Sequence, residues 1–189
     1  MPCELILGGA RSGKSREAER RAAASGLEVS VIATAAAGDA EMAARIRRHQ
    51  AERPPHWRTV ETPLALAAAL CAEAAPQRIV IVDCLTLWLT NLLMAAGDLS
   101  AITDAEELPG FRRERDALLA CLHTLPGRTV LVANEVGLGL VPQTALGRLF
   151  RDEAGRLNQA VAAVCEDVTF VAAGLPLTLK RAGSGAAAC

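Results

Sequence analysis

Aromatic residues are scarce in this chain of 189 residues: Trp, Phe and Tyr together make up 3% of it, and Tyr is absent. Because hydrophobic residues still account for 51%, Ala, Leu and Val must fill the core. The length suits one domain with a core of its own. We expect a single domain over residues 1–181 and a flexible Gly/Ser/Ala-rich tail over residues 182–189.

Other features that the sequence lacks exclude further classes of protein. The net charge is −1, which gives no general attraction to nucleic acid or to acidic membranes. The six cysteines include no Cys-x-x-Cys pair, so reduced thiols are favoured over a disulfide framework or a zinc site. The most apolar stretch, residues 79–93, contains Asp83 and Asn91 and is too short to span a bilayer. With no visible signal peptide, we expect a cytoplasmic protein.

One motif at residues 8–15, Gly-Gly-Ala-Arg-Ser-Gly-Lys-Ser, carries a clear chemical signal. It fits the phosphate-binding loop, G-x-x-x-x-G-K-[ST], and lies between a short apolar stretch and a run of helix formers. In that arrangement, backbone N–H groups and a helix N-terminus surround a triphosphate. Lys14 would reach the β- and γ-phosphates, and the Ser15 hydroxyl would bind Mg²⁺. Lys14 and Lys180 are the only lysines in a chain that otherwise uses arginine. The lysine inside the loop therefore suits a place where a compact ammonium fits and a planar guanidinium does not.

Strand-like and helix-like stretches alternate along the rest of the chain. Strands are expected at residues 3–7, 27–33, 56–61, 78–83, 129–133, 168–173 and 177–180. Helices are expected at residues 16–24, 38–50, 63–74, 85–96, 112–122 and 143–165, with a surface loop at residues 97–110. This alternation predicts an α/β fold with a mostly parallel sheet and helices on both faces. Ligands of such sheets bind at the carboxyl ends of the strands.

Two further residues have both a functional and a structural interpretation. Asp83 closes an apolar strand as a Walker B acid does, so it would hold Mg²⁺ beside Ser15, or it could cap the following helix. His49 follows Met42 and Ile46 at helical spacing among several arginines, which would keep its imidazole neutral and attract a polyphosphate. A neutral imidazole can attack phosphorus. From the pattern alone, a structural histidine on a helix with solvated arginines is the simpler interpretation.

Three other polar residues, Glu61, Asn134 and Glu135, also close strand-like stretches. They could face the same crevice, although each such residue is more often structural. The Asn-Lys-x-Asp sequence with which GTPases bind guanine is absent, so the sequence does not support a GTPase switch.

Short motifs along almost the whole chain resemble one enzyme family, the bifunctional adenosylcobinamide kinase/adenosylcobinamide-phosphate guanylyltransferases of cobalamin biosynthesis. Besides the phosphate-binding loop, the matching segments are residues 32–34, 41–46, 49, 53–54, 56–59, 83–86, 90–93, 134–137 and 155–159. Together they are far more specific than the loop alone, because they occur in the right order over most of the chain.

The resemblance implies a RecA-like P-loop fold, a homotrimer, GTP and ATP as substrates, Mg²⁺ as cofactor and a corrinoid acceptor. It implies that Lys14 and His49 are catalytic, that His49 carries GMP as a covalent intermediate, and that Ser15 and Asp83 hold the metal. The nucleotide contacts that it implies are Gly8, Gly9, Ala10, Arg11, Ser12, Gly13, Lys14, Ser15, Ala33, Thr34, Ala35, Gln50, Ala51, Glu52, Arg53, Glu61 and Asp83.

The sequence departs from the family pattern at two positions. Arg48 stands where some members have a second histidine, and Asp83 stands where others have Glu, which shortens the reach to the metal. Two alternatives use the same loop. A kinase of another small metabolite would form no covalent GMP adduct, and a RecA-like binding module would only hydrolyse its nucleotide slowly. Aromatic residues are too few to mark a surface for the corrinoid.

Overall fold

The structure is a computed structural model, and it describes residues 3–36, 40, 44, 51, 53–97, 99, 102 and 108–183. The predicted helix at residues 38–50 therefore lies almost entirely outside the described residues. So do three of the expected site residues, which are His49, Gln50 and Glu52.

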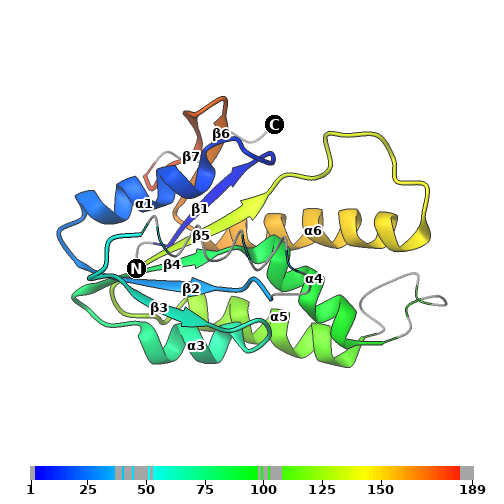
Figure 1. The fold of residues 1–189 in the computed structure, drawn as a ribbon, viewed down its shortest axis with the longest axis horizontal. Helices are drawn as coiled ribbons and strands as arrows, with labels where there is room; N and C mark the ends of the chain where they lie inside the picture. Colours follow the sequence, from blue (N-terminus) through cyan, green and yellow to red (C-terminus); the bar gives the residue numbers. More distant parts are fainter. Residues whose placement is uncertain are drawn as a thin grey trace.

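Seven strands form one sheet in the order β3-β2-β4-β5-β1-β6-β7 (Figure 1). The strands are β1 (Cys3–Gly8), β2 (Glu28–Ala33), β3 (Arg58–Glu61), β4 (Arg78–Asp83), β5 (Arg128–Asn134), β6 (Asp167–Ala172) and β7 (Leu175–Lys180). Every neighbouring pair is parallel except β6 and β7, which are antiparallel. The predicted α/β fold with a mostly parallel sheet is confirmed. The RecA-like P-loop arrangement is confirmed too, since β1 leads through the loop into a helix and β5 lies between β1 and β4.

Helices cover both faces of this sheet, but unequally (Figure 1). The helices are α1 (Lys14–Ala24), α3 (Leu66–Glu73), α4 (Leu85–Ala95), α5 (Pro109–Leu122) and α6 (Ala145–Val164). Among these, only α1 packs on one face, and the other four pack on the opposite face. The helix α5 begins three residues earlier than predicted and shortens the expected surface loop, because Pro109 suits the first turn of a helix.

Alternate residues of the central strands belong to two separate cores. In β4, Val80 and Val82 pack with α3, α4, α5 and α6, whereas Ile79 and Ile81 pack with α1. This period of two is what strand geometry requires when both faces of a sheet are covered. We call the two sides the four-helix face and the α1 face. Trp88, fully buried, anchors the four-helix face and donates from Nε1 to the carbonyl of Leu64 at 2.7 Å.

The end of α6 is fixed to the sheet by two side chains. Cys165, the residue that follows the helix, pairs with Cys3 of β1 in a disulfide with a Cα–Cα distance of 4.7 Å. The expectation that the thiols are reduced is therefore wrong for this pair, whose members are 162 residues apart in sequence. Lys180 Nζ donates to the carbonyls of Ala162, Ala163 and Cys165 at 3.0, 3.2 and 2.6 Å, which satisfies carbonyls that the helix leaves unpaired.

None of the helices in the described part of the chain combines the length and the apolar character that crossing a bilayer requires.

Candidate functional site

The loop between β1 and α1 requires glycine at two positions. A Cβ on Gly8 would lie 2.4 Å from Ser12 Oγ and 2.5 Å from the carbonyl oxygen of Val171, which leaves no room for a side chain. Gly13 has φ +100°, a conformation that residues with a Cβ rarely adopt. The loop is also supported from behind, because Gly174 in the turn between β6 and β7 donates its N–H to the Ser12 carbonyl at 2.8 Å. These contacts fix the path of the loop backbone, and loops of this kind can turn N–H groups toward a bound phosphate.

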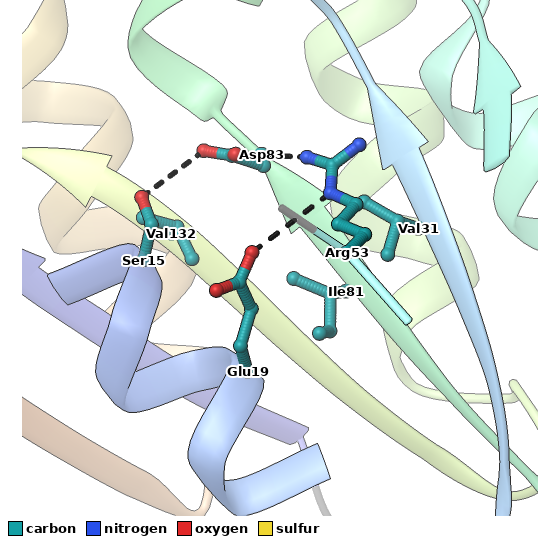
Figure 2. Close-up of a pocket in the computed structure, with 7 residues that line it drawn as sticks. All are labelled: Ser15, Glu19, Val31, Arg53, Ile81, Asp83 and Val132. Carbon is teal, nitrogen blue, oxygen red and sulfur yellow. Dashed lines mark hydrogen bonds and ion pairs between the residues drawn. The ribbon is translucent and has the colours of Figure 1, made fainter. Parts of the chain in front are cut away.

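The first residues of α1 connect the loop to β4. Lys14 Nζ donates to the Gly9 carbonyl at 3.3 Å, so its ammonium lies against the loop itself. Ser15 Oγ donates to Asp83 Oδ1 at 3.4 Å (Figure 2). The fold thus brings together a hydroxyl and a carboxylate that are 68 residues apart in sequence, as the phosphate-binding interpretation requires.

Arg53 closes the same crevice from the other side. Figure 2 shows its guanidinium between two carboxylates, with Nη2 3.3 Å from Asp83 Oδ2 and Nε 3.8 Å from Glu19 Oε1. The Arg53 side chain is only 6% exposed, so this cation is held inside the molecule. The crevice floor is formed by apolar side chains of β2, β4 and β5, which are Val31, Ile81 and Val132.

The oxygen atoms at this point suit a magnesium ion. Mg²⁺ prefers hard oxygen ligands and in nucleotide sites takes one or two from the protein and others from phosphates and water. Ser15 and Asp83 offer one hydroxyl and one carboxylate within hydrogen-bond distance of each other. The alternative that Asp83 caps α4 is wrong, because the N-cap residue is Cys84 and no side chain hydrogen-bonds there.

Thr34 holds the end of β4 in place. Its hydroxyl donates to the Cys84 carbonyl at 2.7 Å and accepts from the Cys84 N–H at 2.9 Å, and its own N–H donates to the Asp83 carbonyl at 3.1 Å. Asn91 on α4 donates to the Thr34 carbonyl at 2.7 Å. The Thr34 hydroxyl is thus already engaged, and its evident effect is to position Asp83.

Cys84 lies next to Asp83 but is not a nucleophile candidate. Burial first, and the Asp83 carboxylate second, raise the pKa of the Cys84 thiol above its ordinary value. A thiol that stays protonated reacts slowly.

Several other expected site residues in the described part of the chain lie at strand ends or in exposed positions. Ala33 and Glu61 end the paired strands β2 and β3, and the Glu61 side chain is exposed. Ala10 and Arg11 are exposed at the top of the loop, and Ala51 is exposed. The roles of these residues stay predictions.

Glu19 was not predicted from the sequence, and the role of Asn134 stayed open. Glu19 lies four residues after Ser15, and this spacing places both side chains on one face of α1, so a signal for it was present. Asn134 ends β5 directly beside Gly8. Glu135 makes local contacts instead: its N–H donates to the Gly8 carbonyl at 3.1 Å, and its Oε1 accepts from the Gly137 N–H at 2.5 Å.

The sequence of this chain matches known proteins along most of its length. The family model described as cobinamide kinase / cobinamide phosphate guanyltransferase matches residues 4–179. The bifunctional adenosylcobalamin biosynthesis protein CobP of Pseudomonas aeruginosa is 61% identical over 177 residues, which are 94% of this chain and 96% of that protein. The corresponding protein CobU of Salmonella typhimurium is 42% identical over 182 residues, covering 93% of this chain and 98% of that protein.

Two solved structures of other proteins are distantly similar. The flagellar accessory protein FlaH from Methanocaldococcus jannaschii has a TM-score of 0.47 at 13% identity, over 96% of this chain and 79% of that one. An ATPase domain of known structure has a TM-score of 0.48 at 11% identity, over 89% of this chain and 68% of that one. Both values are too low to support an argument about function. The sequence matches are sufficient by themselves, and the chain belongs to the cobinamide kinase / cobinamide phosphate guanyltransferase family.

Proposed function

We propose that this chain catalyses two reactions on a corrinoid acceptor. The first phosphorylates the hydroxyl of adenosylcobinamide with a nucleoside triphosphate, and the second transfers GMP from GTP to the phosphate so formed, giving adenosylcobinamide-GDP. The observation that carries the proposal is the convergence of the Lys14–Ser15 end of the loop on Asp83, in a chain 61% identical to a bifunctional relative over 94% of its length.

The first reaction depends on neutralising charge at the terminal phosphate. Backbone N–H groups of residues 9–15 would surround the phosphates, and the Lys14 ammonium, which now contacts the loop carbonyl of Gly9, would turn to the γ-phosphoryl oxygens. Ser15 and Asp83 would hold Mg²⁺, which would supply further positive charge at the β- and γ-phosphates. The chain itself mainly positions the reactants, because phosphoryl transfer needs little covalent chemistry from the protein.

The second reaction uses a nucleophile on the protein. We propose that neutral His49 attacks the α-phosphorus of GTP, that the bond to the bridging oxygen of pyrophosphate breaks, and that GMP stays attached to the imidazole. The acceptor phosphate then attacks the same phosphorus and releases His49. Gln50 to Arg53, together with Ala33 and Ala35 on either side of the buried Thr34, would bind the guanine nucleotide during this step.

Covalent labelling tests this proposal directly. Protein incubated with GTP labelled in its α-phosphate is expected to retain a label that is lost in acid and kept in alkali, as for a phosphoramidate. His49→Ala should bind nucleotide but keep no label. An equally strong label on His49→Ala would exclude the residue as nucleophile. Phosphoryl transfer to a different small metabolite without any adduct would favour the alternative kinase, and slow hydrolysis stimulated by a protein partner would favour a binding module.

We further propose a cytoplasmic homotrimer. The edge strand β7 exposes Leu175, Leu177 and Leu179 by 72%, 61% and 57%, and such an apolar edge strand is usually covered in the working assembly. Light scattering coupled to size-exclusion chromatography should give three times the mass of one chain, and a monomer at assay concentration would contradict this assembly.

A further inference from the structure

The strands β1, β2, β4 and β5 end at the same edge with a residue on the α1 face. Gly8, Ala33 and Asp83 end β1, β2 and β4, and each is already part of the proposed nucleotide site. Asn134 ends β5, the strand between β1 and β4. Because Val132 belongs to the core of the α1 face, the residue two positions later has its side chain on that face as well.

The backbone of Asn134 is held by both helices that flank it on the opposite face. Its N–H donates to Thr86 Oγ1 of α4 at 2.7 Å, and its carbonyl accepts from Asn158 Nδ2 of α6 at 3.2 Å. On the side of the loop, Asn134 pairs with Gly8. The strand end is therefore fixed, and the carboxamide has a defined place.

The hydrogen bonding of the Asn134 carboxamide is incomplete. Asn134 Oδ1 is buried and has no hydrogen-bond partner among the described residues, and the same holds for Ser12 Oγ in the loop. Buried polar atoms nearly always have a partner, so an unpaired one next to a binding loop points to a group supplied by the ligand. An amide oxygen needs a donor, and a hydroxyl provides one.

The position along the strand indicates which end of the ligand is nearby. Asp83 pairs with Val132, and Val132 lines the crevice together with Ser15 and Asp83. Asn134 lies two residues further along β5, about 7 Å beyond Val132 in the direction of the carboxyl ends of the strands. Ligands of open α/β sheets bind at the carboxyl ends of the strands, so an acceptor for the terminal phosphate is expected on this side.

We propose that the Asn134 carboxamide orients the acceptor hydroxyl for phosphoryl transfer, an inference that rests on the proposed function. Oδ1 accepts the hydrogen bond of the hydroxyl, whose oxygen then forms its bond to the γ-phosphorus. The bond from that phosphorus to the β–γ bridging oxygen breaks, and its electron pair leaves with the nucleoside diphosphate. The hydroxyl proton passes to solvent, because a carboxamide does not take it up. Transfer of GMP breaks the α–β linkage instead and does not use this contact.

The experiment compares Asn134→Ala, Asn134→Ser and wild type in both half-reactions. With adenosylcobinamide and saturating nucleotide, we expect kcat of phosphorylation to fall at least 30-fold in Asn134→Ala, with the KM for nucleotide changed less than threefold. Asn134→Ser, which keeps an acceptor oxygen, should recover part of kcat. The yield of covalent GMP should stay within about twofold of wild type, so the two activities separate.

Thr86→Val is the matched control, because it removes the hydrogen bond that holds the Asn134 N–H but keeps the carboxamide group itself. Phosphorylation and labelling each fall by some factor in a variant. If both factors in Thr86→Val equal those in Asn134→Ala, the effect of Asn134→Ala is structural and the inference is overturned. A kcat of Asn134→Ala within threefold of wild type also overturns it.

If wild type does not phosphorylate the corrinoid, the proposed function fails. The inference is then judged on hydrolysis of the bound nucleotide, where water replaces the hydroxyl and the same fall is expected.

Discussion

The two faces of the sheet differ in what their residues do. The four-helix face buries a large continuous core that includes Trp88, Leu70 and Phe111. The α1 face buries a smaller core of mostly Val, Ile and Ala, and at its carboxyl edge the apolar residues give way to Asp83 and Asn134. One face therefore mainly stabilises the strands, and the other carries polar side chains at their ends. Mutations on the two faces should separate stability from activity.

The largest expected effect is on the four-helix face. Trp88→Ala removes a fully buried side chain and its hydrogen bond to Leu64, which should lower the free energy of unfolding by about 3–5 kcal/mol. Urea unfolding followed by circular dichroism measures this change. Activity per folded molecule should be nearly unchanged. A variant that keeps its stability but loses turnover would break the distinction between the faces.

Next comes Lys14→Ala at the start of α1. Removing a positioned cation from a phosphate site should lower turnover about 100- to 1,000-fold, and the covalent label should fall as well. The melting temperature should barely change, because the hydrogen bond from Lys14 to the Gly9 carbonyl lies at the loop and not in either core. Steady-state kinetics and thermal melts check the two halves of this prediction. Turnover close to wild type would remove the phosphate-binding assignment.

A smaller effect is expected for Arg53→Met. The Arg53 guanidinium neutralises Asp83 and Glu19 in the absence of nucleotide. Charges about 4 Å apart interact by about 1 kcal/mol in water and about 4 kcal/mol near a protein surface, so removing Arg53 should strengthen binding of a divalent cation about tenfold or more. Titration of the nucleotide-free protein with Mn²⁺, followed by electron paramagnetic resonance, measures this affinity.

Arg58→Met is the control, because Arg58 pairs with Glu73 at 3.1 Å, away from the crevice. It should leave Mn²⁺ affinity unchanged. Equal affinities in wild type and Arg53→Met would show that Arg53 does not compete with a cation.

The smallest expected effect is an alkaline loss of stability from the four-helix face. Burial, and then the neighbouring Cys71, raise the pKa of the Cys121 thiol from 9.0 to about 12. The folded state therefore keeps a proton that the unfolded state loses, so stability falls as pH rises from about 9 toward 12. The fall should be about 1 kcal/mol at pH 10.

The chain has no Tyr and only two Lys, and the Cys84 thiol, whose raised pKa adds a fall in the same direction, is present in both of the proteins to be compared. Chemical denaturation at pH 8 and pH 10 measures the loss of stability, with Cys121→Ala as the reference. A fall of the same size in Cys121→Ala would assign the effect to other groups.

The fold was largely predictable because each element carries a local signal. The strand of residues 78–83 was predicted with its observed bounds, since four apolar residues end at an acid. The strand predicted from residue 56 begins at Arg58 instead, because Trp57 is in a turn closed by its N–H to the Pro54 carbonyl. The phosphate-binding loop could be identified from the sequence because backbone sterics alone require its glycines.

The rest depends on contacts distant in sequence. No local pattern shows that Arg53 meets Asp83, or that Cys3 meets Cys165. Asn134 was identifiable as the end of a strand. Its position next to the phosphate-binding loop depends on the register between β5, β1 and β4, which only the assembled sheet reveals.

The hydrogen bonds of Lys180 affect how the chain can be probed chemically. The chain has two ε-amino groups, and both are engaged: the exposed Lys180 donates to three backbone carbonyls, and the half-buried Lys14 donates to the Gly9 carbonyl of the loop. Acylation of each lysine can be measured separately by mass spectrometry, and protection of Lys14 relative to Lys180 would then report on occupancy of the phosphate-binding loop, with no engineered label.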